Sequence, residues 1–462
     1  MTSRLVPAAL AVSLCSIAVP AAAQRTLFGK PVADRVPLSE QEIAKRRAAF
    51  QQHLRDGDLV LDGDHLVRGS ALRGEVRPQR AFEDPPHYAT IFLNFFGGEL
   101  SSGTNAAEME AGCVGAGPPI QYPAYAGTEA LALTMIQVFQ NAMEPYAVRI
   151  AYEDPPPAHL PYSMVMMGGD PVDLGMDSGI LGVSCSSDCG DVWWRDSTFA
   201  FTEASSSALT LGNTALQEAA HAFGLDHIDG SEHIMYPFGT SGAKIWATEC
   251  TPYNDATGGI SCTYIHDEFC GEDSGMQNDD AELLAYFGPN APDVDAPVVV
   301  INEPADGLEV ASGTMISVKA DVTDDHEGAG WRLRVVPEQG DELIQNAYDF
   351  ATSWSFAVPD GTYEIYVEAI DHDLNEGSDM VTVYVGSGAP VDTSGDDGGS
   401  DGAGSTGVDD GSGDDEGDDG STGVDQDDDD TTQGCACGIT APRVSTLALL
   451  VLVPLSRRRR RA

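Results

Sequence analysis

Four side chains between positions 217 and 227 are of types that bind a metal ion and move a proton: Gln217, Glu218, His221 and His227. On a helix, residues three and four apart share a face, so the first three would project side by side. Gly224 can end such a helix in the left-handed conformation and return His227 toward the same point. Two imidazoles beside a carboxylate are suited to metal-assisted hydrolysis.

This segment resembles the metzincin zinc-peptidase pattern H-E-x-x-H-x-x-G-x-x-H, which a Met-turn follows. Gln217 stands in place of the first histidine, and the other positions match. Carried over to this chain, the resemblance implies that Glu218 is the general base and that His221 and His227 are zinc ligands. It also implies that Met235 forms the Met-turn beneath the metal.

Gln217 leaves two functions open. A neutral amide oxygen is a weaker zinc ligand than an imidazole nitrogen. Zinc can bind through two histidines and the Gln217 Oε1 atom, or through two histidines and an extra water, with lower affinity in both cases. The chain is then a zinc endopeptidase, or a catalytically dead binding or adhesion protein that keeps the scaffold. An amphipathic helix with incidental histidines is the structural alternative.

The elements that would position these residues predict an α+β domain over residues 87–292. Their order resembles the metzincin catalytic domain, in particular its matrixin-like members, which implies a twisted sheet above the active-site helix and a substrate paired with an edge strand. Apolar and β-branched runs predict strands at 89–96, 147–152, 162–167 and 191–202, the last near the cleft edge. Helices are predicted after Thr128, over 206–223 and over 279–287.

Charge and length restrict the partners. The 462 residues include 24 basic and 73 acidic ones, a formal net charge of −49. This charge argues against nucleic acid and anionic membrane surfaces. Residues 1–23 combine an arginine, an apolar run and a small-residue cleavage site, which is typical of a secretory signal. We therefore expect an exported protein. The metzincin resemblance implies a protein or peptide substrate, and we expect the chain to be a monomer.

Six cysteines lie inside the expected catalytic domain, and an even number in an exported domain predicts disulfides. A short loop between Cys185 and Cys189 is one plausible pairing, and a four-cysteine zinc site is the alternative. The six are Cys113, Cys185, Cys189, Cys250, Cys262 and Cys270.

Residues 24–86 form either a propeptide or an N-terminal extension. Ser39 and Glu42 have the spacing of a capping box, which predicts the start of a polar helix over 40–54. This segment contains no cysteine, so it cannot hold the metal through a thiolate in the manner of a cysteine switch.

Residues 297–386 alternate between apolar and polar positions over six short stretches, which predicts a β-sandwich. The pattern resembles bacterial Ig-like modules. Within it, Asp371, Asp373 and Asn375 have the spacing of a calcium loop, but the acidic residue at the twelfth position is missing. A Ca²⁺ site is therefore the alternative to a solvated turn.

The C-terminal end predicts surface retention. Residues 391–433 are mainly Asp, Gly, Ser and Thr, a composition that cannot form a core and predicts a disordered linker. Residues 434–462 contain Cys435 and Cys437, a short apolar run and five terminal arginines. This segment resembles MYXO-CTERM sorting tails, which implies anchoring at the outer surface. A single membrane span is the alternative.

Overall fold

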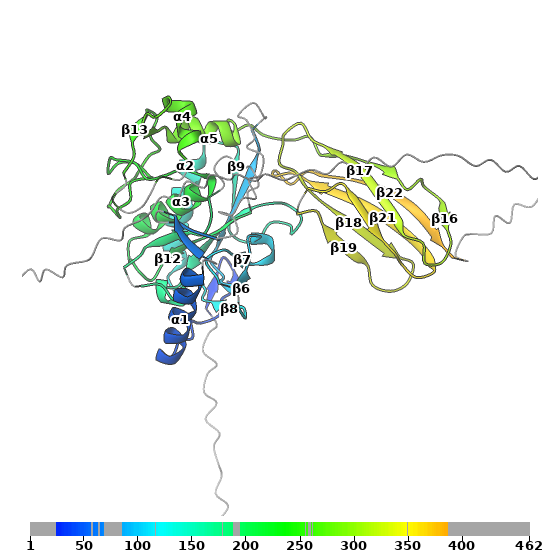
Figure 1. Ribbon diagram of the computed structural model, residues 1–462, viewed down its shortest axis with the longest axis horizontal. Helices are drawn as coiled ribbons and strands as arrows, with labels where there is room; N and C mark the ends of the chain where they lie inside the picture. Colours follow the sequence, from blue (N-terminus) through cyan, green and yellow to red (C-terminus); the bar gives the residue numbers. More distant parts are fainter. Residues whose placement is uncertain are drawn as a thin grey trace, which may run out of the picture. The chain divides into compact units, whose positions relative to one another are not determined.

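The computed structural model describes residues 25–56, 59–62, 65–68, 86–115, 117–177, 179–187, 195–254, 256, 260, 262–348 and 350–386. The expected signal, Cys189, the acidic linker and the tail with Cys435 and Cys437 lie outside these residues. The described chain consists of a mixed α/β part followed by an all-β part (Figure 1). Among its helices, none combines the length and the hydropathy needed to cross a membrane.

A five-stranded sheet forms the centre of the α/β part. Its strands lie in the order β11–β12–β10–β5–β9, and neighbours are parallel except β11, which is antiparallel to β12. Every residue of β5, β10 and β12 is buried. Strands covered on both faces have continuous apolar runs, as these do. The bounds are β5 Ala89–Asn94, β9 Val148–Ala151, β10 Ser163–Gly168, β11 Gly182–Ser184 and β12 Ser197–Phe201.

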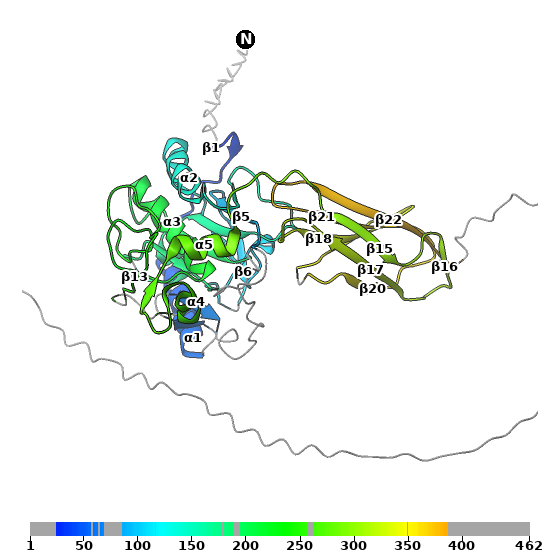
Figure 2. The ribbon, with the colours of Figure 1, turned by 90° about the horizontal axis from the view of Figure 1, so that it is seen from above.

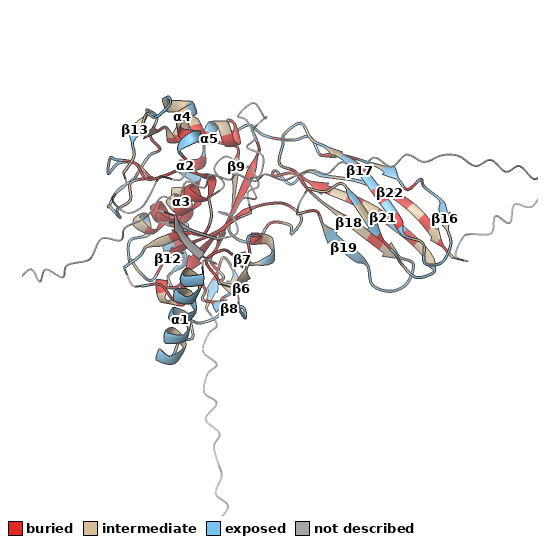
Figure 3. Cartoon of the chain, in the orientation of Figure 1, coloured by how far each residue is buried: buried red, intermediate tan, exposed pale blue. Residues whose placement is uncertain are grey.

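Two helices cover one face of this sheet. Helix α2 (Glu129–Met143) packs against α3 (Ala208–Phe223), and α3 also packs against β10, β11 and β12. Side chains of β5 alternate between two cores: Ile91 and Leu93 join the helices, and Phe92 joins the core on the opposite face. That second face carries the strands β6 Gly98–Ser102, β7 Glu110–Ala111 and β8 Ile120–Tyr122. Figure 3 shows that α3 is buried along most of its length.

Helix α3 ends at Phe223, as the sequence predicts, and begins at Ala208, two residues after the predicted start. The Ser207 side chain accepts a hydrogen bond from Thr210 N, which caps the first turn. Gly224 has φ 110°, and its N–H donates to the carbonyl groups of Ala220 and His221. A residue with a Cβ rarely adopts this conformation, so Gly224 ends the helix and redirects the chain.

Helices α4 (Thr263–Cys270) and α5 (Asp279–Phe287) lie beside each other in Figure 2 and pack together. A short ladder of β13 (Thr251–Pro252) and β14 (Met276–Gln277) precedes α5. The predicted helix over 279–287 is confirmed, and α4 was not predicted. It has only eight residues and no side-chain N-cap, so its sequence lacks a strong start signal.

The N-terminal segment packs as part of the α/β part. Helix α1 (Glu40–Asp56) is confirmed, with Glu42 N donating to Ser39 Oγ. Ahead of it, Leu27 and Val32 are 1% and 3% exposed and belong to the same core as α2 and α3. The remaining short strands are β1 Thr26–Leu27, β2 Lys30–Pro31, β3 Leu59–Asp62 and β4 His65–Arg68.

The all-β part is a sandwich of two sheets, in the orders β15–β17–β20 and β16–β22–β21–β18–β19. Val318 of the first sheet and Ile365 and Val383 of the second share one core. The six predicted strands are confirmed, and β16 and β19 were not predicted. The bounds are β15 Val298–Glu303, β16 Leu308–Val310, β17 Ile316–Thr323, β18 Gly330–Pro337, β19 Leu343–Asn346, β20 Ser353–Phe356, β21 Gly361–Ile370 and β22 Glu376–Val385.

The edge strand of the sheet was not predicted. The strand expected over 191–202 is β12, which covers only Ser197–Phe201 and lies inside the sheet. The edge next to it is β11, Gly182–Ser184. Three residues that begin with a glycine are too short a run to indicate a strand from the sequence.

The cysteine pairing also differs from the short loop expected between Cys185 and Cys189. Cys185 is bonded to Cys113, and Cys250 is bonded to Cys270. Cys262 is disulfide-bonded as well. A four-cysteine zinc site is therefore excluded for these five residues, because their sulfur atoms are already joined in covalent bonds.

Candidate metal centre

His221 and His227 meet at one point. Their Nε2 atoms are 3.0 Å apart, and the two rings cross at 72° with centroids 4.6 Å apart. Both side chains are buried. His221 comes from the last turn of α3 and His227 from the loop after Gly224, so the chain reversal at the helix end brings them together.

The orientation of His221 is fixed by the loop that follows it. Its Nδ1 lies 2.6 Å from the carbonyl oxygen of Leu225, which requires a proton on Nδ1 and leaves a lone pair on Nε2. Burial, and then the neighbouring His227, lowers the pKa of His221 to about 3. The imidazole is therefore neutral at physiological pH, which is the form that binds a metal ion.

Gln217 lies on α3 one turn before His221 and is half-buried. Its Nε2 donates a hydrogen bond to the carbonyl oxygen of Tyr236, 3.2 Å away. This bond joins the helix to the turn that contains Met235. The Oε1 atom is the part of the Gln217 side chain that has the chemistry of a metal ligand.

Glu218 is buried between α3 and the edge strand β11. Gly182 of β11 is so close that a Cβ atom built there would lie 2.6 Å from Glu218 Cγ and 2.7 Å from its Oε1. The same Cβ would lie 2.7 Å from Thr214 Cγ2. Gly182 therefore makes room for the carboxylate of Glu218 beside the strand. Sequence reasoning missed this residue because a lone glycine carries no functional signal.

Met235 lies in the loop that follows α3. Met235 is fully buried, and its carbonyl oxygen accepts a hydrogen bond from Ile228 N at 3.1 Å. The carbonyl of His227 accepts a hydrogen bond from Asn254 N at 2.9 Å. The backbone on both sides of His227 is thus bonded to other segments of the domain.

Asp226 and Asp229 flank His227 and have different environments. Asp229 is exposed, and its Oδ1 accepts a hydrogen bond from Asn254 Nδ2. Asp226 is buried, and its Oδ2 lies 3.0 Å from His266 Nε2 and accepts a hydrogen bond from Cys262 N. Asp229 is thus a solvated loop acid, whereas Asp226 is a buried, hydrogen-bonded one.

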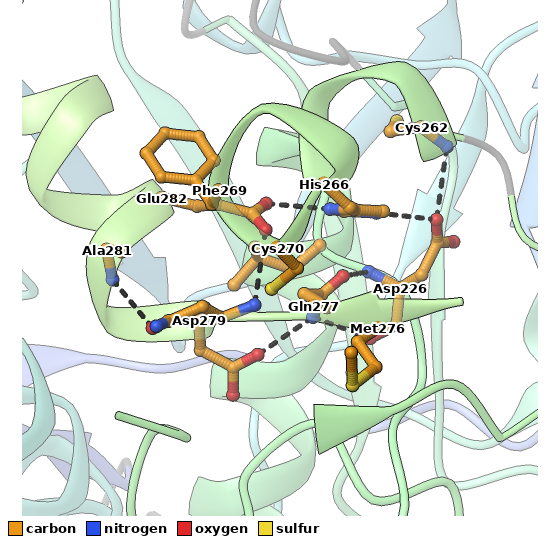
Figure 4. Close-up of polar contacts among 12 residues, drawn as sticks. Asp226, Cys262, His266, Phe269, Cys270, Met276, Gln277, Asp279, Ala281 and Glu282 are labelled. Atoms are coloured by element: carbon orange, nitrogen blue, oxygen red, sulfur yellow. Dashed lines mark hydrogen bonds and ion pairs between the residues drawn. The ribbon is translucent and has the colours of Figure 1, made fainter. Parts of the chain in front are cut away.

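A buried polar network holds the backbone at Asp226 (Figure 4). The side chain of Gln277 accepts from Asp226 N at 2.7 Å and donates to Asp226 O at 3.0 Å. Gln277 Nε2 also donates to Asp279 Oδ1, and the other Asp279 oxygen accepts from Ala247 N. The residue directly before His227 is therefore held through both of its backbone polar groups.

His266 links this network to α5. Its Nδ1 lies 2.8 Å from Glu282 Oε2, on the side opposite Asp226 (Figure 4). Burial lowers the pKa of His266, but the hydrogen bonds to Asp226 and Glu282 outweigh burial and raise it to about 9. Burial raises the pKa of Asp279 to about 7. His266 is thus a buried cation between two carboxylates. Neither Gln277 nor His266 lies in a pattern that reveals this role.

The residues present fit a metal ion through two imidazole nitrogens. For bonds of about 2.0–2.1 Å in a tetrahedral site, two zinc-bound nitrogens lie about 3.3 Å apart, close to the 3.0 Å separation of His221 and His227. The hydrogen bond from His221 Nδ1 to a backbone carbonyl is also usual for a metal-binding imidazole. These two histidines supply two ligands, and Gln217 Oε1 or a water molecule would supply the third.

Comparisons with known proteins give no family for this chain. No family model and no curated protein matches it. Solved chains that match include fibronectin(III)-like modules of Clostridium thermocellum CbhA, at 18% identity, over 20% of this chain and 48% of that one. The PKD domain of human KIAA0319 matches at 16% identity, over 22% and 91%. The TM-score is 0.17 in both cases.

A third match is longer in extent. A nucleoside hydrolase-related hypothetical protein from Saccharophagus degradans matches at 12% identity over 65% of this chain and all of that one, again with a TM-score of 0.17. The chain spans about half the length of the first of these matches. Matches with a TM-score of 0.17 establish no function for this chain.

Proposed function

We propose that this chain is an exported, surface-anchored zinc endopeptidase of the metzincin type. The observation that carries the proposal is the meeting of His221 Nε2 and His227 Nε2 at 3.0 Å, with Glu218 on the same helix as His221. The sheet order, with an antiparallel edge strand β11 beside α3, supports the same assignment. A peptide substrate would pair with β11.

His221 and His227 would hold the zinc ion, with Gln217 Oε1 or water as a further ligand. A zinc ion bound there supplies Lewis acidity toward water and toward the scissile carbonyl group. The Glu218 carboxylate takes the proton from the attacking water and gives it to the leaving amine. The burial of Glu218 excludes bulk water from this proton transfer.

The test compares the full chain with its Glu218→Gln variant. Wild type loaded with zinc is expected to cleave an unfolded substrate such as casein and to lose cleavage with a chelator. Glu218→Gln should keep its zinc content and lose activity by about 10²- to 10⁴-fold, because the proton acceptor is gone. The exposed Glu249→Gln is the matched control and should be unchanged. Equal activity in wild type and Glu218→Gln, or none in either, contradicts the peptidase.

A second candidate is a catalytically dead metzincin-like binding or adhesion protein at the cell surface. The hydrogen bond from Gln217 Nε2 to Tyr236 O favours it, because that bond gives the amide a structural role. The Gln217→His variant separates the two candidates. It should raise zinc affinity about 10-fold or more, since imidazole replaces an amide oxygen. If Gln217→His cleaves the substrate and wild type does not, the result supports the catalytically dead scaffold. If the zinc affinity is unchanged, residue 217 is not a metal ligand.

Surface anchoring has its own test. We expect the full chain to be retained in the cell-surface fraction through residues 434–462, with Cys435 and Cys437 as the processed positions. A chain ending at residue 433 should appear in the medium, as should the double variant Cys435→Ser/Cys437→Ser. Retention of the truncated chain contradicts the role of the tail.

A further inference from the structure

Three carboxylates meet at one end of the β-sandwich. Asp293 precedes β15 in the segment that links the two folded parts, Asp324 follows β17 and Asp371 follows β21. One carboxylate oxygen of each lies within 4.8 Å of those of the other two. Segments far apart in the sequence thus place three acids around one point.

Asp293 and Asp371 are buried and Asp324 is half-buried, and two of the three acids have a buried carboxylate oxygen that accepts no hydrogen bond. The Asp293 side chain is 1% exposed, and its Oδ2 accepts no hydrogen bond. Asp324 Oδ2 is also buried and accepts no hydrogen bond. The nitrogen beside Asp293 Oδ2 is His326 Nδ1 at 3.2 Å, which also lies 3.4 Å from Asp325. A buried carboxylate oxygen without a donor is costly, and a bound cation would offset that cost.

The surrounding backbone holds the three acids in place. Asp293 N donates to Asp373 Oδ2 at 2.8 Å, and Asn375 Nδ2 donates to Asp293 O at 3.2 Å. Asn375 also bonds both oxygens of Asp371, through its N at 2.8 Å and its Nδ2 at 2.8 Å. The residues that have calcium-loop spacing in the sequence are therefore organised, but only Asp371 of that loop belongs to the cluster.

The electrostatics agree with a cation at this point. Burial, and then the charges of Asp293 and Asp371, raise the pKa of Asp324 to about 7. Burial likewise raises the pKa of Asp371, and the charge of Asp293 acts in the same direction. The strongest charges acting on Asp324 are thus other carboxylates, whose repulsion a divalent cation would relieve.

We propose that Asp293, Asp324 and Asp371 bind a calcium ion that fixes the linking segment on the sandwich. Calcium prefers six to eight oxygen ligands at about 2.3–2.6 Å, so oxygens bound to one ion lie no more than about 5 Å apart. The separation within the cluster satisfies this limit. Carboxylates and backbone carbonyls are the ligands that Ca²⁺ takes, whereas zinc favours nitrogen and sulfur.

The test uses the full chain and its Asp324→Asn variant, each freed of metal. Calcium is added during calorimetric titration and thermal unfolding, with magnesium and zinc in parallel samples. Extracellular sites of this kind bind with Kd values of about 10⁻⁴–10⁻³ M, and calcium at 100 times Kd should raise the Tm by at least about 5 °C. The chain has many other acids, so the readout is the difference between wild type and variant.

Asp324→Asn should weaken calcium binding at least 10-fold and remove the Tm increase. Without metal, its Tm should equal or exceed that of wild type, because one repelling charge is gone. Asp341→Asn, at an exposed position of the sandwich, is the control for the same charge change and should behave as wild type. The response should also persist in a His221→Ala/His227→Ala background, which separates it from the metal centre.

Three outcomes overturn the proposal. The first is an equal calcium response in wild type and Asp324→Asn. The second is a response to zinc or magnesium but not to calcium. The third is a variant that is less stable than wild type to the same degree with and without calcium, which would give Asp324 a purely structural role.

Discussion

Two buried histidine environments in the α/β part have opposite charge states. His221 faces another imidazole and a backbone carbonyl, and its pKa is lowered to about 3. His266 faces the carboxylates of Asp226 and Glu282, and its pKa is raised to about 9. Both side chains are equally inaccessible to water, so the partners and not the burial decide which state each imidazole adopts.

The difference shows that two buried imidazoles in one domain can have opposite charge states. His221 is neutral and offers the lone pair of its Nε2 atom next to His227, which suits a metal ion. The network around His266 already contains its cation. Asp226 joins the two regions, since it is bonded to His266 through its side chain and is followed by His227. The charged network therefore holds the residue directly before His227.

Removing the His266 side chain should lower the free energy of unfolding more than any other change predicted here. His266→Ala leaves Asp226 and Glu282 buried without a positive partner, and loss of one partner of a buried ion pair costs about 3–5 kcal/mol. His227→Ala in metal-free protein should cost less, because its neighbour His221 is neutral, yet it should abolish zinc binding. Chemical unfolding of both chelator-treated variants measures the free energies. A greater loss of stability in His227→Ala than in His266→Ala would contradict the assignment of His266 as the buried cation.

The second prediction concerns pH. The pKa of His266 is higher in the folded chain (about 9) than its ordinary value of 6.5, so its stabilisation is complete below pH 6.5 and is lost as the pH rises through 9. Asp279, with its pKa raised to about 7, acts in the same direction at lower pH. At about 1.4 kcal/mol per pKa unit, the free energy of unfolding should fall by up to about 3 kcal/mol between pH 6.5 and 9.

The measurement is chemical unfolding at several pH values in that range. The groups facing His266 are Asp226, Glu282 and the ring of Tyr253, and they remain in the His266→Gln control. This variant should lose most of the pH dependence above 6.5. If the free energy of unfolding of His266→Gln still falls as the pH rises above 6.5, the pH dependence originates from other groups in the chain.

The sequence predicts the helix of the site well and its surroundings poorly. Ser207 and Gly224 are local signals, and the predicted end of α3 at Phe223 is the one observed. The meeting of His221 with His227 follows from spacing along one helix and one turn. The roles of His266 and Gln277 depend instead on α4, β14 and α5 packing against the loop at Asp226, and no local pattern encodes such contacts between distant segments.

For the strands too, local patterns were predicted from the sequence and contacts between distant segments were not. Long apolar runs such as β5 and β10 were predicted because covered strands require them. The edge strand β11 was missed because three residues give no periodicity, and the pairing of Cys113 with Cys185 was missed because spacing does not define connectivity. The calcium-loop spacing at Asp371 was noted, while Asp293 and Asp324 reach the same point only through the fold.

The smallest predicted effect concerns the Glu218 carboxylate, which lies beside Gly182 of β11. Gly182→Ala places a methyl group 2.6–2.7 Å from Glu218 and Thr214, closer than atoms can approach, so the Glu218 side chain or β11 has to move. Overpacking of this kind costs about 1–3 kcal/mol of stability. If Glu218 is the general base, a shift of about 1 Å should lower kcat about 10- to 100-fold with zinc content unchanged. Gly117→Ala, where no atom lies within 4 Å, is the control. Normal kcat in Gly182→Ala would show that the carboxylate beside β11 is not the group that moves the proton.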